Sequence, residues 1–138
     1  MVKRLQILFC IILSCSNCLA QDRFADILDK FQNCVETDNM ELFDSLRLKI
    51  SDGLLTASYA EIARYNKIGG DFCFRHNLFE LAIGRYKDAS KNYLLAGTID
   101  SSYMQSQINL VESYLKMKNE EDAEKNIRKA IISNCQKP

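Results

Sequence analysis

From residue 24 onward, apolar residues recur at intervals of three and four, which is the spacing of one face of an α-helix. In the first such segment they are Phe24, Ile27, Leu28, Phe31, Cys34 and Val35. The only proline is Pro138, at the last position, so no earlier residue forces a helix to break. The pattern predicts an all-α protein.

The periodicity and the capping residues between segments predict about six helices. They are expected at residues 22–37, from 40 to about 53, at 54–68, in a long segment ending before Gly97, from about 101 to 117, and from 120 to 129. The sequence leaves open whether the third helix breaks at Gly69-Gly70. Each glycine costs about 1 kcal/mol of helix propensity, yet it permits close packing.

The second half of the chain carries a regular stripe of small and aromatic residues. Its members alternate spacings of four and three, which seats a long helix tightly against a neighbour; they are Ala82, Tyr86, Ala89, Tyr93 and Ala96.

Residues 110–130 resemble one tetratricopeptide repeat, with large residues on a first helix and an Ala, large apolar, Ala series on a second. The residues that carry the likeness are Leu110, Tyr114, Ala123, Ile127 and Ala130. The resemblance extends over about residues 62–132. It implies antiparallel helix pairs stacked as a short right-handed solenoid, within a single domain at residues 21–138.

An upstream copy is degenerate. It has Gly70 and Ala82 at small positions, but Asn66 and Cys73 where aromatic residues are usual. Ala89, rather than Ala82, precedes Ala123 by the tetratricopeptide period of 34 residues, which suggests an elongated second helix in this copy. Residues 70–93 are also similar to the helical-repeat part of proteasome-lid and signalosome subunits.

Residues 1–20 predict a secretory signal peptide cleaved after Ala20, which places the protein in the secretory pathway, outside the cell or in a periplasm. Lys3 and Arg4 precede an apolar run at residues 5–13, and a small-residue exit follows. The run is too short to span a bilayer, and no later segment is longer, so we expect no membrane span. The alternatives are a cytosolic protein that retains this helix, and a lipoprotein acylated at Cys15.

The charge balance disfavours nucleic acid as a partner. The 138 residues include 18 Lys and Arg and 18 Asp and Glu, and loss of Lys3 and Arg4 with the signal would leave 16 basic residues. The mixed-sign run at residues 116–129 is typical of a solvated helix face.

Three cysteines follow the signal: Cys34, Cys73 and Cys135. An oxidising compartment favours one disulfide among them, with the pairing open, while the alternative is small apolar residues packed in a core. A single histidine and the absence of C-x-x-C beyond the signal argue against a zinc or redox site.

No nucleophile-elbow, phosphate-loop, zinc-protease or calcium-loop motif occurs, so we expect no enzyme, no cofactor and no metal. The expected function is a secreted module that binds a protein or peptide partner. Its candidate contact residues are polar positions expected on the first helix of each pair: Asn66, Asn77, Gln107 and Asn109.

Two other functions stay open. A cysteine-dependent enzyme or inhibitor would use Cys73 or His76. A carrier of an apolar ligand would line a cavity with aromatic residues, namely Phe72, Phe74, Phe79, Tyr86 and Tyr93.

Overall fold

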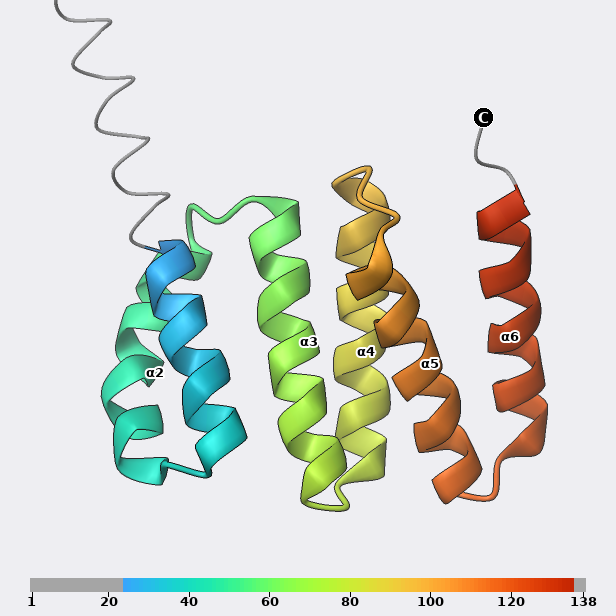
Figure 1. Cartoon of the computed structure of the whole chain (residues 1–138), viewed down its shortest axis with the longest axis horizontal. Coiled ribbons are helices and arrows are strands. Elements are labelled where there is room, and N and C mark those ends of the chain that lie inside the picture. The colour runs from blue at the N-terminus through green and yellow to red at the C-terminus, as the bar shows by residue number, and fades with distance from the viewer. Residues whose placement is uncertain (1–23, 136–138) are drawn as a thin grey trace, which may run out of the picture.

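The computed structural model describes residues 24–135, and within them the chain forms six α-helices and no strand. The first helix covers residues 24–37, followed by α2 (Met40–Leu54), α3 (Tyr59–Arg75), α4 (Phe79–Leu95), α5 (Ser101–Lys116) and α6 (Glu120–Cys135). Successive helices alternate in direction and stand side by side in a row (Figure 1). The predicted all-α class is confirmed; the predicted signal peptide lies outside the described residues.

Two predicted boundaries are wrong. Helix α3 begins only at Tyr59 and runs without a break through Gly69 and Gly70 to Arg75. The reason for the late start is a capping box, in which Ser58 Oγ accepts from the Glu61 N–H while the Glu61 carboxylate accepts from the Ser58 N–H. Helix α6 continues past Lys129 to Cys135, so its last turn has no basic residue.

Four turns between consecutive helices share one backbone geometry: first helix to α2, α3 to α4, α4 to α5, and α5 to α6. Each contains a residue with positive φ, at Asp38 (53°), Asn77 (60°), Gly97 (69°) and Lys118 (59°). The N–H of the next residue donates to a carbonyl five residues back, from Asn39 to Cys34, Leu78 to Cys73, Thr98 to Tyr93 and Asn119 to Tyr114. This is the Schellman arrangement, which satisfies the last carbonyls of a helix. We refer to the first helix with α2, to α3 with α4, and to α5 with α6 as the first, second and third hairpins.

One core cluster joins the first hairpin to α3. Phe31, Cys34 and Val35 of the first helix pack with Leu46 and Ile50 of α2 and with Ile68 of α3. The expected apolar face of the first helix is confirmed, because all its members are buried except the half-buried Ile27.

The stripe on α4 fills the centre of the array. Ala82, Tyr86, Ala89 and Tyr93 are buried, whereas Ala96 is exposed because α4 has already ended at Leu95. Tyr86 packs with Leu110 and Tyr114 of α5, and Tyr93 packs with Tyr103. Consecutive helices from α3 to α6 pack against one another, and α3 also touches α5.

The spacing of the hairpins differs from the one inferred from the sequence. Helices α4 and α6 have 17 and 16 residues, so α4 is not an elongated member of the pair. Ala82 and Ala123 are each the fourth residue of their helix, and Ala89 is well inside α4. The helices of the second and third hairpins all have 16 or 17 residues. Equivalent positions in these two hairpins are therefore separated as Ala82 is from Ala123, and not by the tetratricopeptide period of 34 residues.

Polar contacts tie the first two hairpins together at their tips. The Arg75 guanidinium donates to the carbonyls of Val35 and Glu36, the last turn of the first helix. His76 Nε2 lies 3.1 Å from Asp38 Oδ1, so two adjacent turns touch. A cation at a helix C-terminus is favourable because it meets the negative end of the helix dipole.

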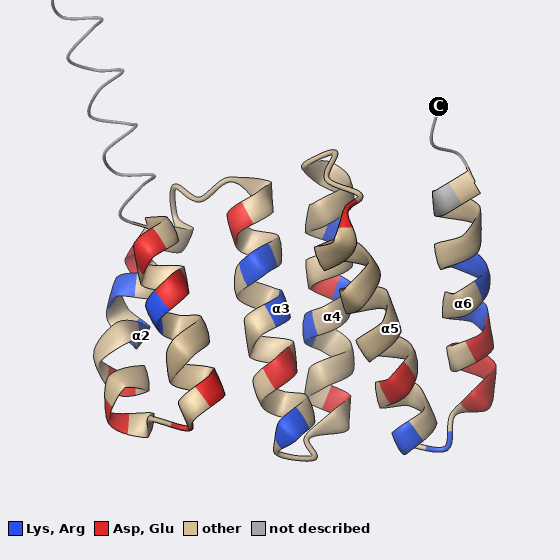
Figure 2. Ribbon diagram, in the orientation of Figure 1, with Lys and Arg blue, Asp and Glu red and all other residues tan. Residues whose placement is uncertain are grey.

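Charged residues of both signs are spread over the helices rather than gathered at one end of the row (Figure 2). Within the described residues, no helix combines the length and apolar character needed to cross a bilayer.

Candidate functional site

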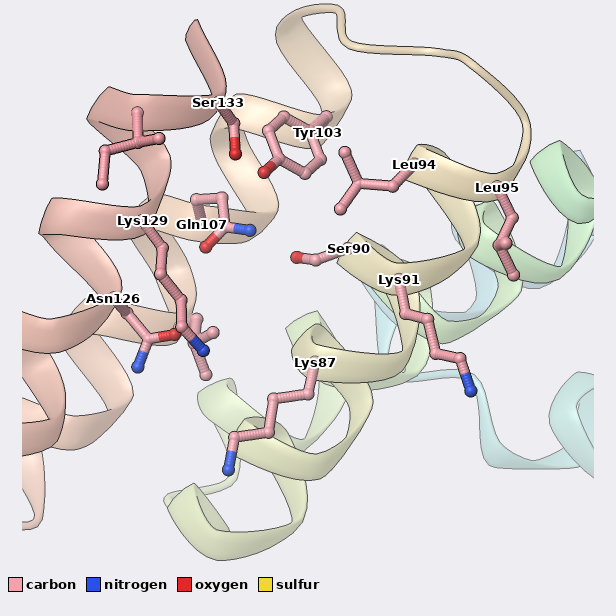
Figure 3. Close-up of a pocket in the computed structure, with 12 residues that line it drawn as sticks. Lys87, Ser90, Lys91, Leu94, Leu95, Tyr103, Gln107, Asn126, Lys129 and Ser133 are labelled. Atoms are coloured by element: carbon pink, nitrogen blue, oxygen red, sulfur yellow. The ribbon is translucent and has the colours of Figure 1, made fainter. Parts of the chain in front are cut away.

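A groove between α4, α5 and α6, with a volume of about 590 Å³, is a candidate site. We call it the α4–α6 groove. Helix α4 contributes Lys87, Ser90, Lys91, Leu94 and Leu95, α5 contributes Tyr103, Gln107 and Leu110, and α6 contributes Asn126, Lys129, Ile132 and Ser133. Figure 3 shows the ends of Ser90 and Gln107 facing each other across this space.

Two buried polar atoms in the groove lack a hydrogen-bond partner among the described residues. They are Ser90 Oγ and Gln107 Oε1, on side chains that are only 6% and 8% exposed. An unsatisfied buried polar group costs about 1–3 kcal/mol. Each atom therefore favours a hydrogen-bond partner that the described residues do not supply.

The groove is basic. Lys87, Lys91 and Lys129 line it, and no Asp or Glu is among its lining residues. None of the three takes part in an ion pair within the described part of the chain. Lys87 Nζ lies 5.4 Å from the centre of the Tyr114 ring, a cation–π contact. Three cations without a carboxylate favour an anionic ligand.

The groove also has apolar walls. Leu94, Leu95 and Ile132 line it, and each is about half exposed. Because these side chains gain from losing contact with water, an anionic ligand that also carries an apolar group fits better than a simple ion.

The four contact residues expected from the sequence do not share one surface. Asn66 is buried between α3 and α4, where it donates to the Ile62 carbonyl and accepts from Arg85 at 3.0 Å. Asn77 occupies the α3–α4 turn with positive φ, a conformation that Asn tolerates well. Gln107 lines the α4–α6 groove, and Asn109 faces a different cavity.

Asn109 belongs to an internal polar cluster. Its Nδ2 donates to Asp71 Oδ1 at 3.0 Å, and the Tyr86 hydroxyl donates to the same oxygen at 2.8 Å. Lys67 Nζ lies 2.8 Å from Asp71 Oδ2. Burial, together with the charge of Asp71, raises the pKa of Tyr86 far above its ordinary value. Since these groups already have partners, the cluster joins α3, α4 and α5 rather than offering a free site.

Cys34, Cys73 and Cys135 are free thiols in the structure. Cys34 is a buried core residue whose thiol donates to the Asn39 carbonyl at 2.8 Å, as the packing alternative expects. Burial raises the pKa of Cys34, and burial also raises that of Cys73, against the opposing influence of Arg85. Raised values disfavour a thiolate nucleophile at neutral pH.

The His76 ring lies 4.3 Å from the Phe72 ring between centroids, tilted by 44°, and His76 also pairs with Asp38. Neither contact involves Cys73. No group of three or more potential metal ligands of the His, Cys, Asp and Glu types occurs within residues 24–135.

The sequence interpretation missed most residues of the groove. Lys87, Ser90, Lys91 and Leu94 follow the spacing of one helical face, next to the Ala and Tyr stripe, so their shared surface could have been found. Lys129 was assigned to a solvated face, and only the packing of α6 beside α4 and α5 places it at the groove. A comparison with protein-family models, curated proteins and solved structures gives no match for this chain.

Proposed function

We propose that this protein is a non-catalytic binding module, built as a short tetratricopeptide-like stack of helix hairpins, and that it binds an acidic peptide segment of a partner protein in the α4–α6 groove. The matching places of Ala82 and Ala123, each buried and the fourth residue of its helix, support a tandem array, because stacked hairpins require a repeated geometry. The module has no need of a metal or cofactor for this role.

The unpartnered pair Ser90 Oγ and Gln107 Oε1 is the observation that carries the proposal. A peptide bond presents one N–H donor and one C=O acceptor, so a single backbone amide can accept from Ser90 and donate to Gln107. Few other ligand groups offer this combination on a chain that continues along a groove.

The rest of the lining defines the peptide. Acidic side chains would meet Lys87, Lys91 and Lys129, and an apolar side chain would lie against Leu94, Leu95 and Ile132. Because the lysine heads are solvated, their attraction should weaken with added salt.

The test uses two acetylated nine-residue peptides, one alternating Glu with Leu and the other alternating Lys with Leu, titrated calorimetrically into the protein. The Glu peptide should bind at least tenfold more tightly than the Lys peptide, with an affinity that falls as salt rises. Lys87→Glu alone should weaken binding of the Glu peptide several-fold, and reversal of both Lys87 and Lys129 should weaken it by tenfold or more. Lys49→Glu on α2, also exposed and outside the groove, is the matched control and should change little.

Failure of the wild-type protein to prefer the Glu peptide would refute the proposal. An equal loss in Lys49→Glu would also refute it, because the effect would then reflect overall charge.

We further propose that the module is secreted after removal of residues 1–20, which the arrangement of Lys3, Arg4 and the apolar run supports. N-terminal sequencing of protein isolated from its own cell should give a terminus at or near Gln21. An intact Met1-Val2-Lys3 terminus on soluble cytosolic material would overturn secretion, and the expectation of a disulfide with it.

A further inference from the structure

A second cavity, of about 260 Å³, lies where the first hairpin meets α3 and α4. We call it the aromatic cavity. It is lined by Phe31, Phe43, Arg47, Ile50, Ser51 and Leu54 from the first hairpin, by Tyr65, Gly69, Phe72 and Cys73 from α3, and by Arg85 from α4. It shares no lining residue with the α4–α6 groove.

Four aromatic rings form one connected wall of this cavity. The Phe31 ring lies 5.7 Å from Phe43 and 5.8 Å from Tyr65, measured between centroids. Phe43 and Phe72 are 6.2 Å apart and nearly parallel, with 9° between their planes. A flat apolar body can stack on such a surface in the offset or edge-to-face arrangements that aromatic pairs prefer.

Two arginines line this cavity. Arg47 is exposed and forms no ion pair with the described part of the chain. Arg85 donates to the neutral Asn66 Oδ1 at 3.0 Å and lies 5.3 Å from the Tyr65 ring centre. No Asp or Glu of the described chain lines the cavity. A planar guanidinium matches a carboxylate through two parallel hydrogen bonds.

Gly69 explains why the cavity is open. Counted from the positive-φ residue of its hairpin, Gly69 in α3 occupies the position of Leu110 in α5, eight residues before Asn77 and Lys118 respectively. Leu110 is a buried core residue in the third hairpin. Gly69 has no side chain to fill the equivalent position in the second hairpin, where the nearest atoms to its β-carbon position belong to Arg85 at 3.6 Å.

We propose that the aromatic cavity binds a small flat apolar carboxylate, an aromatic acid, with its ring on the Phe and Tyr wall and its carboxylate between Arg47 and Arg85. The volume is slightly below the roughly 300 Å³ at which sites for drug-sized ligands begin, so the ligand is a small acid rather than a long-chain one. The site is independent of peptide binding in the α4–α6 groove.

The probes are 2-naphthoate and its neutral isostere 2-naphthamide, titrated into the protein and followed by calorimetry and by amide chemical shifts in NMR spectra. Wild-type protein should bind the acid at least tenfold more tightly than the amide, with the largest shifts at Gly69 and Phe72. Arg47→Gln should weaken binding of the acid several-fold, because Arg85 alone then meets the carboxylate, without a change in amide binding. Gly69→Leu should weaken both probes tenfold or more.

Gly84→Ala is the matched control for the added side chain, because a β-carbon there meets nothing within 4 Å. It should leave both probes unaffected. Unfolding curves of every variant separate loss of the site from loss of the fold, and Arg47 is exposed enough that its replacement should not unfold the protein.

Equal binding of acid and amide to the wild-type protein would overturn the proposal, as would undiminished binding to a folded Gly69→Leu variant. Because the peptide experiment reads a different groove, either proposal can fail while the other stands.

Discussion

Gly70 lies directly against the ring of Tyr86, so that a β-carbon at residue 70 would stand 2.6 Å from Tyr86 Cε1 and 2.8 Å from Cδ1. Tyr86 cannot easily move, because it is fully buried and its hydroxyl is bonded to Asp71. The glycine thus allows α3 and α4 to approach closely. The neighbouring Gly69 is different, since the nearest atoms to its β-carbon position belong to Arg85 at 3.6 Å.

Adjacent glycines should therefore respond in opposite ways to alanine. Gly70→Ala should destabilise the protein by about 1–2 kcal/mol, because overpacking outweighs the gain in helix propensity. Gly69→Ala should stabilise it by about 0.5–1 kcal/mol, since its new contact is an ordinary one. Urea unfolding measures both, and a loss of similar size in the two variants would contradict the packing argument.

The Ser90 hydroxyl should strengthen peptide binding and lower the stability of the free protein. Its hydroxyl has no partner among the described residues, so Ser90→Ala removes an unsatisfied buried group and should stabilise the free protein by about 1 kcal/mol. The same change should weaken the Glu–Leu peptide several-fold. Ser106→Ala is the control, because that buried hydroxyl already donates to the Ser102 carbonyl at 2.9 Å. A Ser90→Ala variant that is less stable than the wild type would contradict the argument that the Ser90 hydroxyl is unsatisfied in the free protein.

Tyr86 should make the fold sensitive to alkaline pH. Burial raises the pKa of its phenol above the unfolded value of about 10, so above pH 10 the unfolded chain loses a proton that the folded protein keeps. Stability due to Tyr86 is complete below pH 10 and falls by up to about 1.4 kcal/mol per pH unit above it. The stability advantage of wild type over Tyr86→Phe should be constant from pH 7 to 9 and shrink beyond pH 10. A constant difference up to pH 11 would exclude this linkage.

Lys118 holds a backbone conformation that suits glycine. Its φ is 59°, and a residue with a β-carbon pays about 1 kcal/mol there. Lys118→Gly should raise the unfolding free energy by about that amount. A glycine, Gly97, already holds this conformation in the equivalent turn after α4. Lys116→Gly, two residues earlier and helical, should instead lower it by about 0.5–1 kcal/mol. Differential scanning calorimetry would show whether the two variants shift in opposite directions.

Features that depend on residues close together in the sequence could be predicted, and features that depend on contacts between helices could not. The apolar face of the first helix and the buried Ala82, Tyr86, Ala89 and Tyr93 follow from the 3.6-residue period alone. Helix boundaries are harder to predict, since the sequence allows more than one start or end for a helix. The capping box at Ser58 selects one start for α3, and the tight fit of Gly70 on Tyr86 compensates for the propensity that two glycines cost.

The positions where neighbouring helices meet required the tertiary structure. Asn66 and Gln107 look alike in sequence, yet one is hydrogen-bonded to Arg85 and the other has an unpartnered oxygen in a groove. Ile127, the large apolar residue in the repeat-like pattern, is 46% exposed, and no helix follows α6 within the described residues.

The sequence by itself determined the all-α class and the amphipathic faces, because each depends on residues within a few positions of one another. Only the tertiary structure decided that Lys87 and Lys129 line one groove and that Arg47 and Arg85 line one aromatic cavity. Those pairs lie on different helices, and their distance depends on how whole helices pack rather than on any local pattern.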